Sequence, residues 1–349
     1  MPQNFRKTAM NILVTGGAGF IGSHTAVELQ LKGHDVFIID NLSNARAEVL
    51  PAIAEITGRQ AFFHQIDCCD YHAMDAFFAA NKIDAVIHFA ALKAVGESVE
   101  KPIEYYRNNL LSLINLLDLC RNYKVNKVVF SSSCTVYGQP DYLPIDEKAP
   151  VKQPESPYGN TKKMAEDILR DTSKATDLHI ISLRYFNPVG AHPTAIIGEY
   201  PLGKPANLMP VITQTAIGKI KQFSVFGTDY DTRDGSNIRD YIHVVDLGQA
   251  HVVAIERLLN NKTKSKFEVF NLGTGNGISV LELIAAFESN TGVKLNYQLS
   301  PRRAGDVVQV WADTNYANDE LGWKASRNIN EMVVDAWRWE KKLAGIMDN

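Results

Sequence analysis

Two side chains one helical turn apart could carry out acid–base chemistry in this chain. They are Tyr158 and Lys162 in the stretch SPYGNTK. Ser156 suits a helix N-cap and Pro157 suits the first helical position, so the stretch predicts a helix with both side chains on one face. A lysine ammonium near a phenol favours the phenolate, which would make Tyr158 a base. Taken alone, such a pair is more typical of an ordinary helix surface.

A glycine-rich stretch near the start of the chain, TGGAGFIG, has the spacing of a dinucleotide-binding loop. It follows an apolar run and precedes a helical pattern, and its glycines allow the backbone to approach a pyrophosphate at the positive end of that helix. Asp40 ends the next apolar run. A carboxylate there would accept hydrogen bonds from the ribose hydroxyls of adenosine and repel a 2′-phosphate, so the sequence predicts NAD rather than NADP. The glycines of the pattern are Gly17, Gly19 and Gly22, with Gly16 before them.

A polar stretch, SSSCTVYG at 131–138, follows another apolar run. In open α/β sheets, ligands bind beyond the carboxyl ends of the strands. Ser133 is therefore expected at the same edge as the glycine-rich loop. Tyr158 and Lys162 would converge on it there, beside the nicotinamide of the expected cofactor.

Apolar runs that suit strands alternate with helical patterns through the first half of the chain. The runs are continuously apolar, which indicates burial on both faces and hence a parallel sheet covered by helices. The predicted fold is therefore α/β, with a Rossmann-type doubly wound parallel sheet over 10–187. The expected strands span 11–16, 35–40, 61–67, 84–90, 127–132 and 178–186, and the expected helices span 20–31, 70–80, 103–123 and 157–175.

The rhythm changes after Asn187, where Gly, Pro, Asn and Asp become frequent. Residues 188–349 are expected to form a smaller α/β substrate domain, with some strands crossing back to the first sheet. Residues 1–9 are expected to be a loose N-terminal extension. The expected elements of the second half are helices near 209–221, 279–290 and 330–344, and strands at 267–273 and 293–298.

Composition excludes several classes of partner. The chain has 349 residues and a net charge of −3, which gives no bulk electrostatic case for nucleic acid or an anionic membrane. No apolar run approaches the roughly 20 residues that span a bilayer. The four cysteines lack zinc or redox spacing, and His243 lacks a second ligand at metal spacing, so no metal site is expected. Unpaired cysteines suit the cytoplasm.

The motifs taken together resemble the extended short-chain dehydrogenase/reductase family and, within it, the UDP-sugar 4-epimerases. The resemblance runs from about Asn11 to about Trp339, and its motifs are HFAALKAVGESVEKP, SSSCTVYG, SPYGNTK, LRYFNPVGAHP, NLMP, RDYIHVVDL and PRRAGDV. It implies that Tyr158 removes the proton of the sugar 4-hydroxyl, with Lys162 and Ser133 assisting. Hydride would pass from carbon 4 to NAD and return to the opposite face of the 4-keto sugar.

The resemblance also implies binding residues and a homodimer formed by the helices at 103–123 and 157–175. Asp67 and Cys68 match the adenine contact, and Lys93 matches the phosphate and ribose region of the cofactor. The other cofactor-side positions are Gly16, Gly19, Phe20, Ile21, Gly22, Asp40, Asn41, Phe89, Ala90, Asn108, Ser133, Tyr158, Lys162 and Tyr185. The positions on the UDP-sugar side are Ser133, Thr135, Tyr158, Asn187, Asn207, Leu208, Arg239, Arg303, Asp306 and Val310.

Two other functions remain open at this stage. Nucleotide-sugar 4,6-dehydratases of the same family place Asp-Glu where this chain has Cys134 and Thr135, which cannot do acid–base work at carbon 5. A non-catalytic NAD-sensing member need not keep the serine, tyrosine and lysine together. Within the epimerases, a tyrosine at the place of Val310 accompanies restriction to glucose and galactose. Valine is smaller, so we expect the N-acetylated sugars to be accepted as well.

Overall fold

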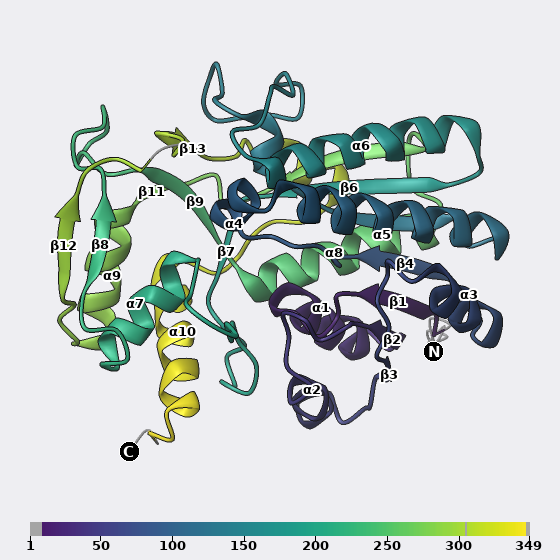
Figure 1. Ribbon diagram of the computed structural model, residues 1–349, viewed down its shortest axis with the longest axis horizontal. Helices are drawn as coiled ribbons and strands as arrows, with labels where there is room; N and C mark the ends of the chain where they lie inside the picture. Colours follow the sequence, from purple (N-terminus) through teal and green to yellow (C-terminus); the bar gives the residue numbers. More distant parts are fainter. Residues whose placement is uncertain (1–8, 304–305, 347–349) are drawn as a thin grey trace, which may run out of the picture.

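The computed structural model describes residues 9–303 and 306–346 (Figure 1). Within these residues the larger part of the molecule is built on a seven-stranded parallel sheet in the order β10-β6-β5-β4-β1-β2-β3. The order runs outward in both directions from β1 and β4, so the topological switch point lies between these two strands. The strands are β1 (Asn11–Thr15), β2 (Asp35–Ile39), β3 (Phe62–His64), β4 (Ala85–His88), β5 (Lys127–Ser133), β6 (His179–Tyr185) and β10 (Phe267–Leu272).

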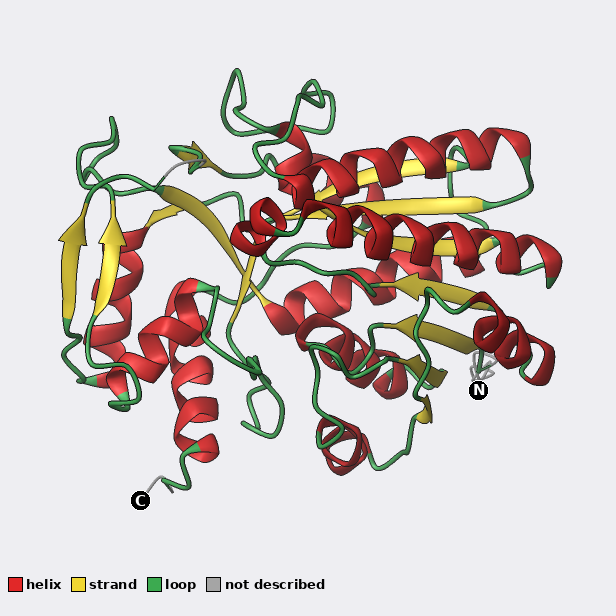
Figure 2. Cartoon of the chain, in the orientation of Figure 1, coloured by secondary structure: helices red, strands yellow, loops and turns green. Residues whose placement is uncertain are grey.

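Helices cover both faces of this sheet (Figure 2). One face packs against α1, α2 and α8, and the other packs against α3, α5 and α6. Because both faces are buried, the strands carry apolar residues at nearly every position. The arrangement confirms the predicted doubly wound α/β class. The helices are α1 (Phe20–Leu31), α2 (Val49–Thr57), α3 (Tyr71–Ala80), α5 (Pro102–Asn122), α6 (Pro157–Ala175) and α8 (Val244–Leu259), with the short α4 (Val95–Glu100) before α5.

The smaller part of the molecule contains a mixed sheet, a two-stranded parallel ribbon and helices around their own apolar core. β9 is the centre of the mixed sheet: it pairs in parallel with β7 and β13 and antiparallel with β11. The elements are β7 (Asn187–Val189), β9 (Ile238–His243), β11 (Gly277–Ser279), β13 (Gln309–Val310), the ribbon β8 (Phe223–Phe226) and β12 (Tyr297–Ser300), and the helices α7 (Leu208–Ala216), α9 (Val280–Thr291) and α10 (Ile329–Leu343).

The chain after Asn187 contributes to both parts. β10 extends the large sheet by pairing with β6, and α8 packs against α1 beneath that sheet. Gly248 of α8 permits this close packing, because a Cβ there would lie only 3.3 Å from the backbone of His24 and Thr25.

Several elements differ from the expectations drawn from sequence. The helices α2, α4 and α8 were not predicted. α8 is buried along most of its length, so its polar face is narrow and consists mainly of Gln249, Glu256 and Arg257. The strand expected at 61–67 is only the three-residue edge strand β3, the helix expected at 209–221 ends at Ala216, and the strand expected at 293–298 lies at 297–300.

Candidate active site

The carboxyl ends of the central strands bring the predicted site residues to one edge of the large sheet. Thr15 of β1 is paired in register with His88 of β4, and Ser133 of β5 with Tyr185 of β6. The glycine-rich loop follows Thr15, and the predicted cofactor residues Phe89 and Ala90 follow His88. These loops therefore leave the sheet side by side at the switch point, where ligands of this fold class bind.

The glycine-rich loop has the backbone geometry of a phosphate cradle. Gly16 has a φ of +68°, and a Cβ at this position would lie 2.7 Å from the backbone nitrogen of Ala90. A Cβ on Gly22 would lie 2.3 Å from the carbonyl oxygen of Gly16. Gly19 is the N-cap of α1 and has no side chain to cap the first turn, which begins with Phe20 and Ile21. The loop thus fits the pyrophosphate of a dinucleotide at the positive end of α1.

Asp40 stands at the end of β2, beside this loop. Its carboxylate accepts hydrogen bonds from the backbone N–H groups of Ala18 (3.1 Å) and Leu42 (2.9 Å), and burial raises its pKa. The side-chain amide of Asn41 donates to Asp67 at 3.1 Å, and Asp67 directly precedes the buried Cys68. The structure therefore places the predicted adenosine-side residues together at the ends of β2 and β3.

Tyr158 and Lys162 lie where the sequence predicted, in the first turns of α6. Ser156 caps this helix by accepting a hydrogen bond from the N–H of Gly159 at 3.2 Å. The Lys162 Nζ atom donates to the carbonyl oxygen of Ser131 at 2.7 Å and lies 5.9 Å from the centroid of the Tyr158 ring. Both side chains are buried, so the helix faces them toward the end of β5.

The charges of this pair are governed by burial. Burial raises the pKa of the Tyr158 phenol far above its usual range, and a hydrogen bond with Ser133 acts in the opposite direction. Burial lowers the pKa of Lys162 to about 7, and the carboxylate of Glu166 opposes this change. In the protein alone, burial therefore has the largest effect on the pKa of both groups.

Ser133 ends β5 and caps the short 3-10 helix Cys134–Tyr137. Its Oγ atom accepts hydrogen bonds from the N–H and the hydroxyl of Thr135, at 3.2 and 3.0 Å. Tyr185 lies deeper in the same site: its hydroxyl is 2.6 Å from the Oγ atom of Ser131, and burial raises its pKa to about 12. Ser133 and Thr135 therefore form one hydrogen-bonded pair at the end of β5, and Ser131 and Tyr185 form another.

Three further cofactor-side residues make contacts with other parts of the chain. The N–H of Phe89 donates to the carbonyl oxygen of Thr15 at 3.0 Å. Asn108 accepts a hydrogen bond from the thiol of Cys69 on its carbonyl oxygen, which places it beside the adenosine-side residues. The ammonium of Lys93 lies 3.3 Å from the carboxylate of Glu199.

The predicted UDP-sugar residues come from the smaller part of the molecule. Arg239 of β9 is half-buried, and burial lowers its pKa; Asp306 counters this effect and Arg303 adds to it, so the three charges lie within electrostatic reach of one another. Arg303 donates to Asp306 at 2.8 Å. Asn207 is the N-cap residue of α7 and Leu208 its first residue.

Two further predicted residues flank β9. Asn187 opens β7 and is paired with Tyr241 of β9. Val310 of β13 is paired with Arg239 and is only 6% exposed, in a cluster with Val136, Tyr137 and Phe186. Val310 therefore packs behind the 3-10 helix that follows Ser133.

The histidines His88 and His243 are buried in the core. Nδ1 of His88 is 2.8 Å from the Thr15 hydroxyl, and burial lowers the pKa of this imidazole to about 3. Nε2 of His243 is 3.3 Å from Asp335.

Across residues 9–303 and 306–346, no group of three or more histidine, cysteine or acidic side chains could hold a metal ion. Over the same residues, no helix has the length and apolar character needed to cross a membrane.

Sequence reasoning missed Glu199 and Glu166, which contact predicted site residues. Glu199 accepts hydrogen bonds from Lys93 and Asn207. Glu166 lies one turn after Lys162 and accepts a hydrogen bond from Ser132 at 2.6 Å. Neither lies in a motif with known chemistry, although the i+4 spacing of Glu166 from Lys162 was visible in the sequence.

Comparison with known proteins identifies the family. A family model described as GDP-mannose 4,6 dehydratase matches residues 13–336. The UDP-glucose 4-epimerase of Bacillus subtilis is 52% identical over 332 residues, which cover 95% of this chain and 97% of that protein. The solved structure of UDP-glucose 4-epimerase from Bifidobacterium longum in complex with NAD+ and UDP has 48% identity and a TM-score of 0.92, and the match covers 97% of this chain and 100% of that one.

A third comparison matches a solved structure whose name includes both UDP-Glc and UDP-GlcNAc. The structure of the UDP-Glc/GlcNAc 4-epimerase from Campylobacter jejuni has 37% identity and a TM-score of 0.82, and the match covers 96% of this chain and 100% of that one. The shared fold, the site at the switch point and the extent of these matches agree. The chain belongs to the UDP-glucose 4-epimerases of the extended short-chain dehydrogenase/reductase family.

Proposed function

We propose that this protein is an isomerase that interconverts UDP-galactose and UDP-glucose by inverting carbon 4 of the sugar, with NAD as its cofactor. The main support for the proposal is that Ser133, Tyr158 and Lys162 lie at the edge of the large sheet where β1 leads into the glycine-rich loop. Relatives named UDP-glucose 4-epimerase match nearly the whole chain, and one solved relative holds both NAD+ and UDP.

The residues present fit NAD. The glycine-rich loop and the N-terminus of α1 would hold the pyrophosphate, Asp40 the adenosine ribose, and Lys93 the phosphate and ribose near the nicotinamide. When bound, NAD+ supplies a hydride acceptor and donor, and a second positive charge beside Tyr158.

Tyr158 would act as the base that takes the proton of the 4-hydroxyl. Burial works against a phenolate, so positive charge must compensate. An ammonium about 6 Å from a phenolate stabilises it by about 3 kcal/mol at an effective dielectric near 20. The Nζ atom of Lys162 lies 5.9 Å from the centroid of the Tyr158 ring. Ser133 would hydrogen-bond the same hydroxyl of the sugar.

The nucleotide end of the substrate would be held apart from the reacting carbon. Arg239 and Arg303 suit a diphosphate, and Asn207 suits its oxygens or the neighbouring ribose. With the diphosphate anchored and the 4-keto sugar released from Tyr158, the sugar can turn and present its other face. NAD bound at this site would supply both the uptake of the carbon-4 hydride that leaves the 4-keto sugar and its return, and Tyr158 would give the proton back to the 4-oxygen after the sugar has turned, so carbon 4 would be inverted.

The dehydratase alternative requires an acid–base pair that this site does not supply. The family model carries the name of a 4,6-dehydratase, but the two residues after Ser133 are Cys134 and Thr135. Burial raises the pKa of the Cys134 thiol to about 12, and the Thr135 hydroxyl is bonded to Ser133. Neither group can remove a proton from carbon 5 near neutral pH.

Substrate range is the finer part of the proposal. Val310 is a small side chain behind the segment that carries Ser133 and Thr135. We therefore include the N-acetylated sugars, so that UDP-GalNAc and UDP-GlcNAc would also be interconverted.

A homodimer formed by α5 and α6 completes the proposal. These helices pack side by side on the outer face of the large sheet (Figure 1). Their solvent side carries the exposed apolar residues Ile103, Leu111, Ile114 and Met164. Two copies placed face to face would bury these side chains in a four-helix bundle. The four free cysteines suit a cytoplasmic location.

Incubation of the purified protein with UDP-galactose tests the central claim. We expect UDP-glucose to accumulate until the two sugars reach equilibrium, without added cofactor, because NAD should remain bound through purification. Formation of a 4-keto-6-deoxy sugar would favour the dehydratase, and absence of any product from NAD-loaded protein would favour a non-catalytic role.

A further inference from the structure

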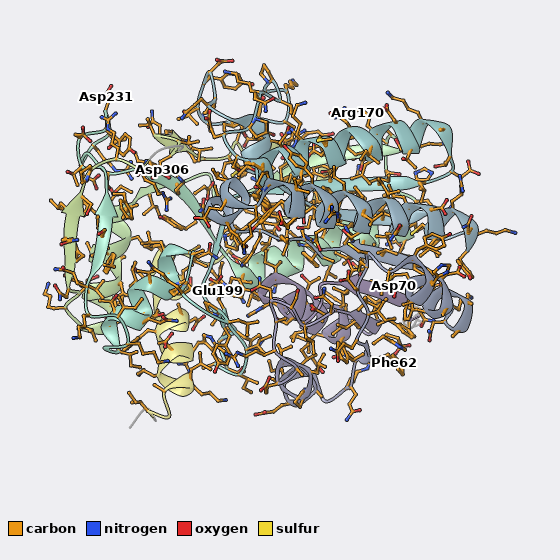
Figure 3. The ribbon with its side chains drawn as sticks, in the orientation of Figure 1. Phe62, Asp70, Arg170, Glu199, Asp231 and Asp306 are labelled. Carbon is orange, nitrogen blue, oxygen red and sulfur yellow. The ribbon has the colours of Figure 1, made fainter. Side chains whose placement is uncertain are left out.

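The segment between β7 and α7, which both belong to the smaller part of the molecule, contains a compact loop. Ala191 and Gly198 form an antiparallel bridge, and the N–H of His192 donates to the carbonyl oxygen of Ile197 at 3.0 Å. Glu199 follows directly after this closed loop. Figure 3 labels Glu199 between the large sheet with its helices and the smaller part that contains α10.

The C-terminal helix fixes the backbone of Glu199 from one side. A Cβ on Gly198 would lie 2.5 Å from the indole of Trp339, so the loop lies flat against this ring. The indole N–H of Trp339 donates to the backbone carbonyl oxygen of Glu199 at 2.9 Å. The position of Glu199 is therefore set by α10 and does not depend on its own side-chain contacts.

The carboxylate of Glu199 contacts one residue from each ligand side. Its Oε1 atom accepts hydrogen bonds from Nζ of Lys93 at 3.3 Å and from the side-chain amide of Asn207 at 2.6 Å. The side chain of Glu199 is only 13% exposed, whereas that of Lys93 is 44% exposed. The next residue, Tyr200, makes a cation–π contact with Arg46, which lies in the loop after β2. The Arg46 guanidinium is 4.0 Å from the centroid of the Tyr200 ring.

We propose that Glu199 is a positioning residue that holds Lys93 and Asn207 ready for the two diphosphate ligands, and so couples cofactor binding to substrate binding. This inference rests on the proposed function, because it takes Lys93 to face NAD and Asn207 to face the UDP-sugar. Ligands lose affinity when they must order flexible side chains on arrival. Because the backbone of Glu199 is fixed, its carboxylate can order Lys93 and Asn207 before NAD and the UDP-sugar bind, so neither ligand has to order these side chains.

The position of the carboxylate also makes the proposal distinguishable from a simple charge effect. A negative charge near two diphosphates repels them, so a carboxylate that did nothing else would weaken binding. Its removal would then tighten the binding of UDP-galactose. If Glu199 positions its two partners, removal must have the opposite effect.

The experiment measures KM and kcat for UDP-galactose with the NAD-loaded enzyme. Glu199→Ala loses both hydrogen bonds, and we expect KM to rise about tenfold, as for loss of a hydrogen bond of about 1.4 kcal/mol, with kcat changed less than about threefold. Glu199→Gln can still accept from Asn207 and should recover most of the KM. NAD should leave Glu199→Ala about tenfold faster than it leaves the parent.

Double variants test whether Glu199 acts through its partners. In an Asn207→Ala background, Glu199→Ala should change KM by less than about twofold, because the contact is already gone. In a Lys93→Met background, Glu199→Ala should leave the rate of NAD release unchanged. The proposal would be overturned if the effect of Glu199→Ala were as large in either background as in the parent, or if Glu199→Ala lowered the KM for UDP-galactose.

Two further variants separate positioning from general loss of structure. Glu288 also accepts hydrogen bonds from one lysine and one N–H, those of Lys294 and Leu295, but lies on α9 away from the site. Glu288→Ala should keep KM within about twofold of the parent. Trp339→Phe keeps a ring against Gly198 and loses only the N–H bond to Glu199, and should raise KM even if Glu199→Ala does not fold. An unchanged KM in both Trp339→Phe and Glu199→Ala, or in Trp339→Phe alone if Glu199→Ala does not fold, would contradict positioning when the parent is active, whereas an inactive parent would contradict the proposed function itself.

Discussion

Arg184 and Glu166 form a buried ion pair beneath the candidate active site. Nη2 of Arg184 donates to Glu166 at 2.5 Å and its Nε atom donates at 2.9 Å, and both side chains are less than 5% exposed. Glu166 also accepts from Ser132 at 2.6 Å and from Ser182 at 3.0 Å. One carboxylate therefore ties α6, which carries Tyr158, to β5 and β6.

Removal of one partner of this pair should destabilise the protein strongly. Glu166→Gln leaves the guanidinium of Arg184 buried without its counter-charge, and breaking such a pair costs about 3–5 kcal/mol. Urea denaturation of the variant should show this loss in the free energy of unfolding. Asp171→Asn, which breaks an exposed pair with Lys174, is the control and should cost less than about 1 kcal/mol. Equal losses in the two variants would contradict the assigned importance of burial.

Replacement of Tyr158 by phenylalanine should remove the proposed base while leaving the fold intact. The variant lacks only the hydroxyl, so NAD should stay bound and the unfolding temperature should remain close to that of the parent. Turnover of UDP-galactose should fall at least about a hundredfold, the usual effect of a positioned base. A turnover rate like that of the parent would remove Tyr158 from the mechanism.

Asp40 should make the protein prefer NAD over NADP. Its carboxylate is fixed by two backbone N–H groups at the end of β2, so a 2′-phosphate there would meet a negative charge that cannot move away. Calorimetric titration of cofactor-free protein should show NAD binding at least about tenfold more tightly than NADP. Asp40→Ser should narrow this difference. Equal affinities in the parent would show that Asp40 does not select the cofactor.

Burial of Lys162 should lower the free energy of unfolding at neutral and acidic pH. Its pKa is lowered by burial to about 7, whereas an unfolded lysine has a pKa near 10.4, so the folded state binds fewer protons between these values. Stability is therefore lost as the pH falls from about 10 to about 7, and the loss is complete below that. Lys162→Met removes this cost but also the hydrogen bond to Ser131.

Cofactor-free Lys162→Met protein should thus unfold at a higher temperature than the parent at pH 6. The net gain should be about 2 kcal/mol, from a shift of more than three pKa units less one charged hydrogen bond. The advantage should shrink as the pH rises toward 10, when measured by circular dichroism. An advantage that grows with pH would contradict the assigned sign.

The predictability of the fold and site follows from how far each feature depends on local sequence. The glycine-rich loop requires close backbone approach within seven residues, and α6 carries its cap, its proline and Tyr158 within four, so both were found. Glu166 and Glu199 owe their roles to partners 8 to 106 residues away, such as Asn207, Ser182 and Lys93. Such contacts form only when the chain is folded, and the spacing of residues in the sequence does not predict them.

The same distinction explains the errors in the elements. The strands of the large sheet are apolar because both of their faces are covered, and this signal is strong in the sequence. α8 packs beside α1 on one face of that sheet, so most of its positions are buried and its helical period shows only in a narrow stripe that includes Gln249, Glu256 and Arg257. The short strands around β9 are held mainly by pairing with distant segments, and two- or three-residue strands leave too little pattern to detect.

Val310 is expected to leave room for a 2-acetamido group, and Val310→Tyr should remove that room. Val310 is buried in a cluster with Val136, Tyr137 and Phe186, where a tyrosine side chain cannot be added without overpacking. The larger ring would have to turn out of this cluster, toward the segment that carries Ser133 and Thr135. The ring would then occupy the space through which the N-acetyl group of the keto sugar must pass.

Product analysis with UDP-galactose and UDP-GalNAc side by side tests this expectation. The parent should convert both substrates, Val310→Tyr should lose the N-acetyl reaction while it keeps the galactose reaction, and Val310→Ala should keep both. The overpacked variant should be less stable by about 1–3 kcal/mol, so both reactions are measured well below its unfolding temperature. A parent that converts UDP-galactose but shows no reaction with UDP-GalNAc would contradict the expectation that Val310 admits the N-acetylated sugars.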